Sequence, residues 1–165
     1  MPKQFNYSIV IHYSEIALKK SNRKFFEDIF IKNIKQHISQ FQYSSIKLYE
    51  ARILINDINF SDWADYKKIL LNVMGLKNFL LTVKTRSSIE DIKEASSYLI
   101  KDKNFKSFRI SAKRNYKKLN FNSQDVNIII GEYVQKKTNK PVNLNNPDLN
   151  MHIELLKDYS YLGVE

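Results

Sequence analysis

The order in which strand-like and helix-like segments follow one another constrains the fold of this 165-residue chain more than any other feature. Apolar residues form a strand pattern over 6–12, and a pattern of helical spacing starts at Ser21. Two strand patterns lie within 45–57, a second helix starts at Ser61, and another strand follows over 78–83. The predicted order of the first half is therefore strand, helix, strand, strand, helix, strand.

This βαββαβ order is that of the ferredoxin-like fold, which many unrelated functions share. Terminal signals support both helices. Ser21 or Asn22 is the expected N-cap of the first helix, Ser61 can cap the second, and Gly75 can end it. No Gly or Pro marks the turn between the two strands of 45–57.

The second half predicts a further α/β unit. Ser87 and Glu90 have the spacing of a capping box at the start of a helix. A strand pattern covers 106–112, and Ser123 can cap another helix. Two short strands are expected to close the chain after a loop bracketed by prolines.

We therefore expect two domains, over 1–77 and 78–165, without a flexible linker between them. Hydrophobic residues make up 43% of the chain, enough for packed cores. No apolar run approaches the roughly 18 residues of a membrane span. The N-terminus lacks a signal-peptide layout and the chain has no cysteine, so we expect a cytoplasmic protein without disulfides.

The sequence contains no recognisable catalytic or metal-binding motif. Three isolated glycines cannot form a dinucleotide fingerprint or a phosphate-binding loop. The three histidines are scattered singly, and a single histidine on a strand or amphipathic helix is more often structural than a metal ligand. We expect neither a catalytic residue nor a metal ligand in this chain.

Positive charge is the strongest functional signal. Lys and Arg number 27 against 17 acids, a formal charge of +10, which favours a polyanionic partner. Residues 1–77 carry 12 basic and 7 acidic side chains, and 78–165 carry 15 and 10. Because both halves are basic, we expect a long charged ligand that contacts both, although an AT-rich coding sequence can also produce such a composition.

Basic residues gather where the first helix is expected to begin. The cations are Lys19, Lys20 and Arg23, and Asn22 lies among them as a further expected contact. Free N–H groups and the positive end of the helix dipole attract an anion here, and a bound phosphate would compensate the added cations. Two alternatives stay open: the lysines point into water, or Glu15 pairs with Arg23.

A denser basic segment covers 101–118, "KDKNFKSFRISAKRNYKK", with eight cations and one acid. Over 108–113 apolar residues alternate with polar ones, so a strand would pack one face and project cations from the other. Tyr116 could stack on an exposed base. The side chains expected to contact nucleic acid are Arg109, Lys113, Arg114, Tyr116, Lys117 and Lys118. A solubilising surface is the alternative.

Four segments resemble the tRNA 4-thiouridine synthetase family, a group of tRNA sulfurtransferases also linked to thiamine biosynthesis. "HYSEIALKKSNRKFFE" (12–27) and "GLKNFLLTV" (75–83) are similar to the start and last strand of its ferredoxin-like domain. "FRISAKRNYKKLNFNSQDV" (108–126) and "VNLNNPDLNMHIELLKDYSYL" (142–162) resemble the THUMP domain signature and ending. The resemblance implies a chain of mixed α+β and α/β class, in which a ferredoxin-like βαββαβ domain is followed by a THUMP α/β domain.

The resemblance also implies that both domains hold the acceptor stem and 3′ CCA end of tRNA. The matched positions are Lys19, Asn22 and Arg23 in the first motif and Arg109, Lys113 and Arg114 in the THUMP motif. Lys20 departs from the family pattern, which often has glycine there; this change adds charge to the loop.

In this family a pyrophosphatase-type ATP-binding domain with an S-G-G-x-D-S loop adenylates uridine 8, and a rhodanese domain with a persulfide-forming cysteine often follows. The chain has neither that loop nor a cysteine. We therefore expect a tRNA-binding module that needs no cofactor of its own and presents tRNA for 4-thiouridine formation by a separate ATP-dependent domain or chain. A homodimer is also compatible with the sequence.

Three alternatives remain. The chain could serve another tRNA-modifying enzyme, such as a methyltransferase, deaminase or pseudouridine synthase, because these also use THUMP domains. It could be a small-anion or nucleotide-binding enzyme, which would require a deep pocket with converging polar groups. It could also be a dimerisation domain, which would require a large apolar patch.

Overall fold

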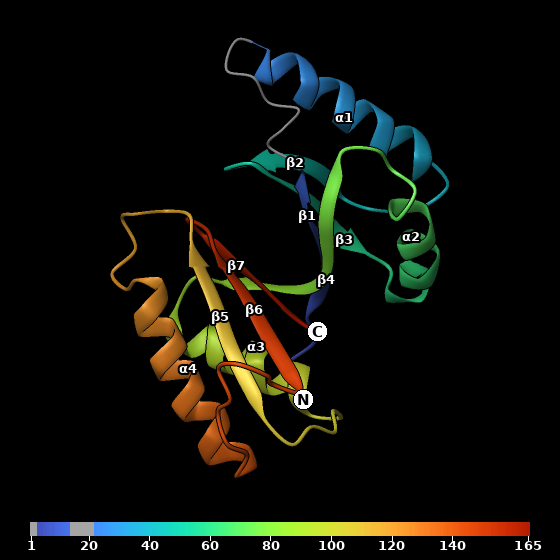
Figure 1. Ribbon diagram of the computed structural model, residues 1–165. Helices are drawn as coiled ribbons and strands as arrows, with labels where there is room; N and C mark the ends of the chain where they lie inside the picture. Colours follow the sequence, from blue (N-terminus) through green and yellow to red (C-terminus); the bar gives the residue numbers. More distant parts are fainter. Residues whose placement is uncertain (1–2, 14–21) are drawn as a thin grey trace. The chain divides into compact units, whose positions relative to one another are not determined.

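The computed structural model describes residues 3–13 and 22–165 (Figure 1). The chain divides into two compact units, one formed by Asn6–Leu81 and the other by Thr82–Glu165 together with the described residues before Asn6. The division lies within strand β4 (Leu76–Arg86), which begins in the first unit and ends in the second. The sequence-based boundary after residue 77 falls in the same strand.

The first unit has the expected βαββαβ order. Its elements are β1 (Asn6–Tyr13), α1 (Arg23–His37), β2 (Ser45–Tyr49), β3 (Arg52–Ile58), the 3-10 turn η2 (Phe60–Asp62), α2 (Trp63–Leu70) and the first part of β4. The strand order is β2-β3-β1-β4, and β3 pairs antiparallel with both β1 and β2. This arrangement confirms the predicted ferredoxin-like domain.

The core of this unit lies between one face of the sheet and both helices. Alternate strand residues such as Ile11 and Ile53 are fully buried together with Ile34 of α1 and Tyr66 and Leu70 of α2. The apolar spacing recognised in the sequence therefore corresponds to the buried faces of these elements.

The β2–β3 turn explains how a hairpin forms here without glycine or proline. Tyr49 pairs with Arg52, so Glu50 and Ala51 form a two-residue turn. Both have positive φ, 45° for Glu50 and 63° for Ala51. Two-residue turns of this kind require positive φ at both central positions and favour Asn-Gly, so neither residue signals the turn in the sequence.

The helix ends of this unit agree with the prediction at Asn22 and differ from it at Ser61 and Gly75. Asn22 is the N-cap of α1, one of the two candidates named from the sequence. Ser61 does not cap α2, because it lies inside η2 and Asp62 is the N-cap. Gly75, at φ +87°, lies in the turn that precedes β4, after α2 has ended at Leu70.

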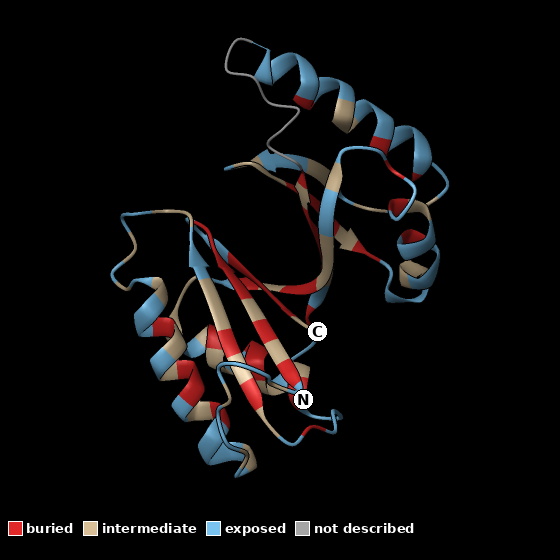
Figure 2. Ribbon diagram, in the orientation of Figure 1, coloured by how far each residue is buried: buried red, intermediate tan, exposed pale blue. Residues whose placement is uncertain are grey.

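The second unit is an α/β layer. Its elements are the last part of β4, α3 (Ile89–Ile100), β5 (Phe108–Arg114), α4 (Ser123–Thr138), β6 (Leu149–Leu155) and β7 (Tyr159–Val164). The strand order is β4-β7-β6-β5, with β5 parallel to β6 and β7 antiparallel to its neighbours. α4 packs on β5, α3 packs on β7, and the two helices contact each other. Buried and less buried positions alternate along β5 and most of β6 (Figure 2).

Both predicted caps of this unit are displaced by one residue. The Ser88 hydroxyl, not Ser87, accepts from the backbone N–H of Asp91 at the start of α3. Ser87 instead donates to the carbonyl of Leu156, 2.8 Å away, which connects the end of β4 to the β6–β7 turn. Asn122 rather than Ser123 caps α4, because Asn and Asp side chains fit the extended N-cap backbone as well as Ser does.

Among the described helices, none is long and apolar enough to cross a membrane.

Candidate nucleic-acid interface

Strand β5 has the two-sided character predicted for it. Phe108 and Ile110 are buried under the helices, whereas Arg109 and Ser111 on the other face are half-buried and Lys113 is exposed. Ser111 donates to Oδ1 of Asn150 on the neighbouring strand at 2.7 Å. The face away from α3 and α4 is thus polar.

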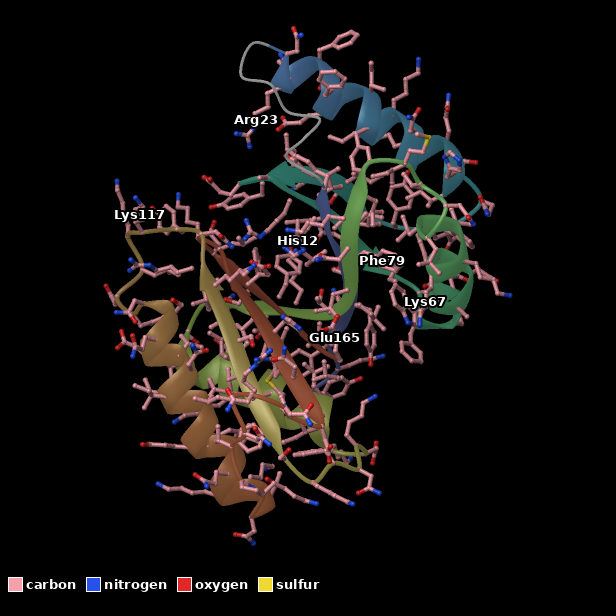
Figure 3. All side chains as sticks on the ribbon, viewed as in Figure 1. His12, Arg23, Lys67, Phe79, Lys117 and Glu165 are labelled. Carbon is pink, nitrogen blue, oxygen red and sulfur yellow. The ribbon has the colours of Figure 1, made fainter. Side chains whose placement is uncertain are left out.

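Cations gather where β4, β5 and β6 end and β7 begins. Arg114 lies opposite Leu155, and the next residue donates its backbone N–H to the Leu155 carbonyl at 2.9 Å. The loop after β5 and the turn after β6 therefore leave the sheet at the same end, where Arg86 also lies opposite Tyr159. We call this set the carboxyl-end cluster; its members are Arg86, Lys113, Arg114, Lys117, Lys118 and Lys157, all exposed. Figure 3 shows Lys117 projecting from the loop after β5.

Two members of this cluster were not predicted from the sequence. Arg86 and Lys157 are isolated from the basic segment in the sequence and reach the same sheet end only through strand pairing. These two residues could have been predicted only from the pairing of β4 with β7, of β7 with β6 and of β6 with β5.

The side chains of the cluster form no close ion pairs within the described residues. No side-chain hydrogen bond of the six members is found in the described part of the chain, and Arg86 acts on an acid only at longer range, by lowering the pKa of Asp91. The carboxylate directly opposite Lys113, that of Glu154, is buried and accepts from Nδ2 of Asn115 at 2.8 Å. Exposed cations without acid partners produce a local positive potential that attracts phosphates.

Tyr116 lies in the loop between the cluster lysines and is half-buried. Its carbonyl accepts a long bond from the backbone N–H of Leu119, 3.4 Å away. Its role as a stacking residue stays a prediction.

Arg109 occupies a more internal position than the other proposed RNA contacts. Its Nη1 donates to the carbonyl of Leu144 at 2.9 Å. Its Nε is buried and has no hydrogen-bond partner among the described residues. The guanidinium therefore ties the loop before β6 to β5, and this structural contact was not visible in the sequence.

In the first motif, Lys19 and Lys20 lie outside the described residues, so their expected roles stay predictions. Asn22 is exposed, and its side chain makes no capping hydrogen bond. Arg23 donates from Nε to Oε1 of Glu27, four residues on, at 2.8 Å. Glu15, the partner considered from the sequence, lies outside the described residues. Arg23 keeps 52% of its side chain exposed.

The histidines have ordinary structural partners. His12 Nδ1 lies 2.7 Å from Oδ1 of Asn78, and His37 Nδ1 lies 2.7 Å from a main-chain carbonyl one turn earlier. His152 Nε2 lies 2.8 Å from Oε2 of Glu165. Within 3–13 and 22–165, no group of three or more His, Asp or Glu side chains could hold a metal ion.

Comparison with known protein families assigns both units. Residues 8–79 match the ThiI ferredoxin-like domain family, and residues 86–165 match the THUMP domain family. The chain consists of a ThiI ferredoxin-like domain followed by a THUMP domain. The carboxyl-end cluster therefore belongs to the THUMP domain, and the Arg23–Glu27 pair belongs to the ferredoxin-like domain.

Both domains occur together in longer relatives. The chain is 31% identical over 157 residues to a probable tRNA sulfurtransferase from Bacillus licheniformis, covering 93% of this chain and 39% of that protein. It is 32% identical over 154 residues to another from Mycoplasmopsis synoviae, covering 93% and 38%. The chain thus spans about two fifths of the length of the curated relatives it matches.

Two solved structures have the same fold. PH1313 from Pyrococcus horikoshii superposes with a TM-score of 0.84 at 22% identity, covering 96% of this chain and 54% of that one. A 4-thiouridine synthetase in complex with RNA and ATP gives 0.78 at 24% identity, covering 97% and 41%.

Proposed function

We propose that this chain binds tRNA through the THUMP domain and presents it for 4-thiouridine formation at position 8 by a separate ATP-dependent catalytic domain or chain. One observation carries the proposal: six exposed cations without acid partners lie at one end of the THUMP sheet, in a chain whose relatives are probable tRNA sulfurtransferases. The RNA complex of a protein with this fold supports the same assignment.

The proposed mechanism of binding is electrostatic. Lys113, Arg114 and their neighbours in the carboxyl-end cluster neutralise phosphates of the acceptor stem and 3′ CCA end and release counterions. Contacts of this kind fix the position of the RNA without reading its sequence. Lys19, Lys20, Asn22 and Arg23 supply a second contact in the ferredoxin-like domain, and Tyr116 stacks on a base.

The catalytic step is proposed to come from outside the 165 residues. The relatives are about two and a half times as long as this chain, so most of each of them has no counterpart here. Co-purification of a catalytic chain that forms 4-thiouridine with ATP would support this part, whereas a partner that forms a methylated or deaminated nucleoside would replace it.

The binding test uses an acceptor-stem minihelix carrying a 3′ CCA tail, titrated at several salt concentrations. The double variant K113A/R114A should bind about tenfold or more weakly, since a hydrogen bond to a charged group contributes about 1.5–3 kcal/mol. The slope of log affinity against log salt should fall by about one for each phosphate contact removed.

Matched control variants distinguish a loss of the carboxyl-end cluster from a general loss of positive charge. Lys101 and Lys136 lie at the C-terminal ends of α3 and α4, which lead back to the opposite end of the same sheet. K101A/K136A removes the same charge from the THUMP domain, and K67A/K68A removes it from α2. Equal losses of affinity in all three double variants would reject the carboxyl-end cluster as the binding surface.

A further inference from the structure

The chain passes between its two compact units at two places. One passage, between residues 81 and 82, lies inside β4, so a continuous strand makes this connection. The other lies between Phe5 and Asn6, where β1 begins. Residues 3–5 therefore belong to the compact unit of the THUMP domain, although β1 itself belongs to the ferredoxin-like domain. We call residues 3–5 the strap.

Phe5 is the anchor of the strap. It is 5% exposed, although it stands next to the first residue of a strand that belongs to the other unit. Its ring centroid lies 4.9 Å from that of Tyr98 on α3, with the two ring planes inclined by 49°. Burial of an aromatic side chain is the largest favourable contribution that a segment of this length can make.

Lys3 adds a polar contact with the same helix. Its Nζ lies 3.2 Å from Oδ1 of Asp91 and 2.9 Å from Oε2 of Glu94, so the cation bridges two carboxylates one turn apart on α3. Asp91 is already held by the hydroxyl of Ser88, which donates to its Oδ2 at 2.6 Å. The Lys3 side chain is 44% exposed, and exposed ion pairs stabilise little. Lys3 therefore directs the strap along α3, while Phe5 supplies most of the hold.

The strap continues directly into a central strand of the ferredoxin-like sheet. β1 lies between β3 and β4 in the strand order and pairs antiparallel with β3. Alternate residues of β1, such as Ile9 and Ile11, are fully buried in the core of that domain. Side chains of the strap on α3 thus connect the interior of one domain to a helix of the other.

We propose that the strap is a second, non-covalent connection between the two domains, which limits their relative movement so that both can hold one tRNA at once. This rests on the proposed function, in which the carboxyl-end cluster and a contact in the ferredoxin-like domain bind the same RNA. With β4 as the single connection, more freedom of movement would be lost on binding. The strap removes part of this cost beforehand and raises the effective concentration of one contact once the other is made.

The connection is tested first without RNA, by NMR relaxation of the backbone amides of the full chain. In the wild type, amides of β1 and β3 should report the same rotational correlation time as amides of β5 and β6. F5A removes the anchor, and K3E keeps the buried ring but places an acid against Asp91 and Glu94. Both variants should show shorter and different correlation times for the two domains. A common correlation time that persists in both variants overturns the strap.

The effect on RNA is measured with a tRNA transcript. We expect F5A to bind about tenfold more weakly, a fraction of the gain that linked binding sites can provide. K19A/K20A, which removes the proposed ferredoxin-domain contact, should weaken F5A by a smaller factor than it weakens the wild type. Equal factors in the two backgrounds would mean that the strap does not couple the domains, and would overturn the proposal.

Matched controls remove the same groups elsewhere in the THUMP domain. Phe105, like Phe5, is 5% exposed, and its ring packs against Phe108 instead of α3. F105A should leave the common correlation time intact, and K103E reverses the charge of an exposed lysine outside the strap. Equal losses of tRNA affinity in F5A and F105A, or in K3E and K103E, overturn the strap. Failure of the wild type to bind tRNA, with the relaxation results as expected, would instead reject the proposed function.

Discussion

Arg23 and Glu27 form a hydrogen-bonded ion pair across one turn of α1, with Nε 2.8 Å from Oε1. The same oxygen accepts from the hydroxyl of Tyr13 on β1 at 2.9 Å. Glu27 is 7% exposed, whereas 52% of the Arg23 side chain is exposed. The carboxylate is therefore part of the packed interior, while the guanidinium that it neutralises reaches solvent, where it can still meet a phosphate.

Removing the Tyr13 hydroxyl should destabilise the protein modestly. Y13F deletes one donor to a buried carboxylate, and we expect the free energy of unfolding to fall by about 1 kcal/mol, the usual net contribution of a hydrogen bond. Urea denaturation measures the change. Tyr159, 45% exposed, offers the control: Y159F should change the free energy by less than about 0.5 kcal/mol. An unchanged Y13F midpoint would contradict the role assigned to this bond.

The same tyrosine should make stability fall at high pH. Burial, followed by the hydrogen bond to Glu27, raises the pKa of Tyr13 from 10.0 to about 12. Between these two pKa values the Tyr13 hydroxyl is protonated in the folded state but ionised in the unfolded state. The stabilisation that Tyr13 provides is therefore complete below pH 10 and is lost as the pH rises through about 12. Burial also raises the pKa of Tyr66. In urea titrations at increasing pH, the stability advantage of wild type over Y13F should therefore shrink above pH 10; an advantage that grows with pH would disprove the assignment.

Replacing Tyr66 with phenylalanine should not destabilise the protein and is expected to stabilise it. Tyr66 is fully buried, its ring lies 4.3 Å from that of Phe41, and its hydroxyl has no hydrogen-bond partner among the described residues. A buried polar group without a partner costs about 1–3 kcal/mol. Y66F keeps the ring and removes that group, so thermal unfolding should shift upward. A marked downward shift would mean that the hydroxyl has a partner in solution.

The start of α4 offers a test between neighbouring residues. The Asn122 side chain accepts from the N–H of Asp125 at 2.8 Å, and Oδ2 of Asp125 accepts from the N–H of Asn122 at 2.9 Å. We expect N122A to cost about 1 kcal/mol of unfolding free energy. S123A should cost less than about 0.5 kcal/mol, because Ser123 lies inside the helix. The reverse ranking in chemical denaturation would restore Ser123 as the cap.

Arg109 should act on RNA binding partly through the loop before β6. R109M keeps the aliphatic stem but removes the donor to the Leu144 carbonyl. We expect faster hydrogen exchange at Asn145 and Asn146, whose N–H groups donate to Oδ1 of Asn143 in that loop. Ile130 in the core of α4 should keep its protection, which distinguishes local loosening from global unfolding. Unchanged exchange in the loop would assign Arg109 to RNA contact alone.

Local pattern was sufficient for the order of elements. Helical spacing on α1 and α2 and alternation on β5 are properties of neighbouring residues, so the first six elements and the two-sided basic strand could be predicted. Caps were placed only to within one residue at Ser87 and Ser123, because several adjacent polar residues can cap equally well.

The sequence by itself determined the two α/β units, the excess of positive charge and its concentration around β5, since each depends on residues close together in the chain. Only the tertiary structure decided which charges lie together. Strand pairing brings Arg86 and Lys157 to the sheet end where Lys113 lies, and a side-chain hydrogen bond joins Arg109 to the carbonyl of Leu144. These relationships depend on register between strands distant in sequence, and that register is fixed by the packing of whole elements.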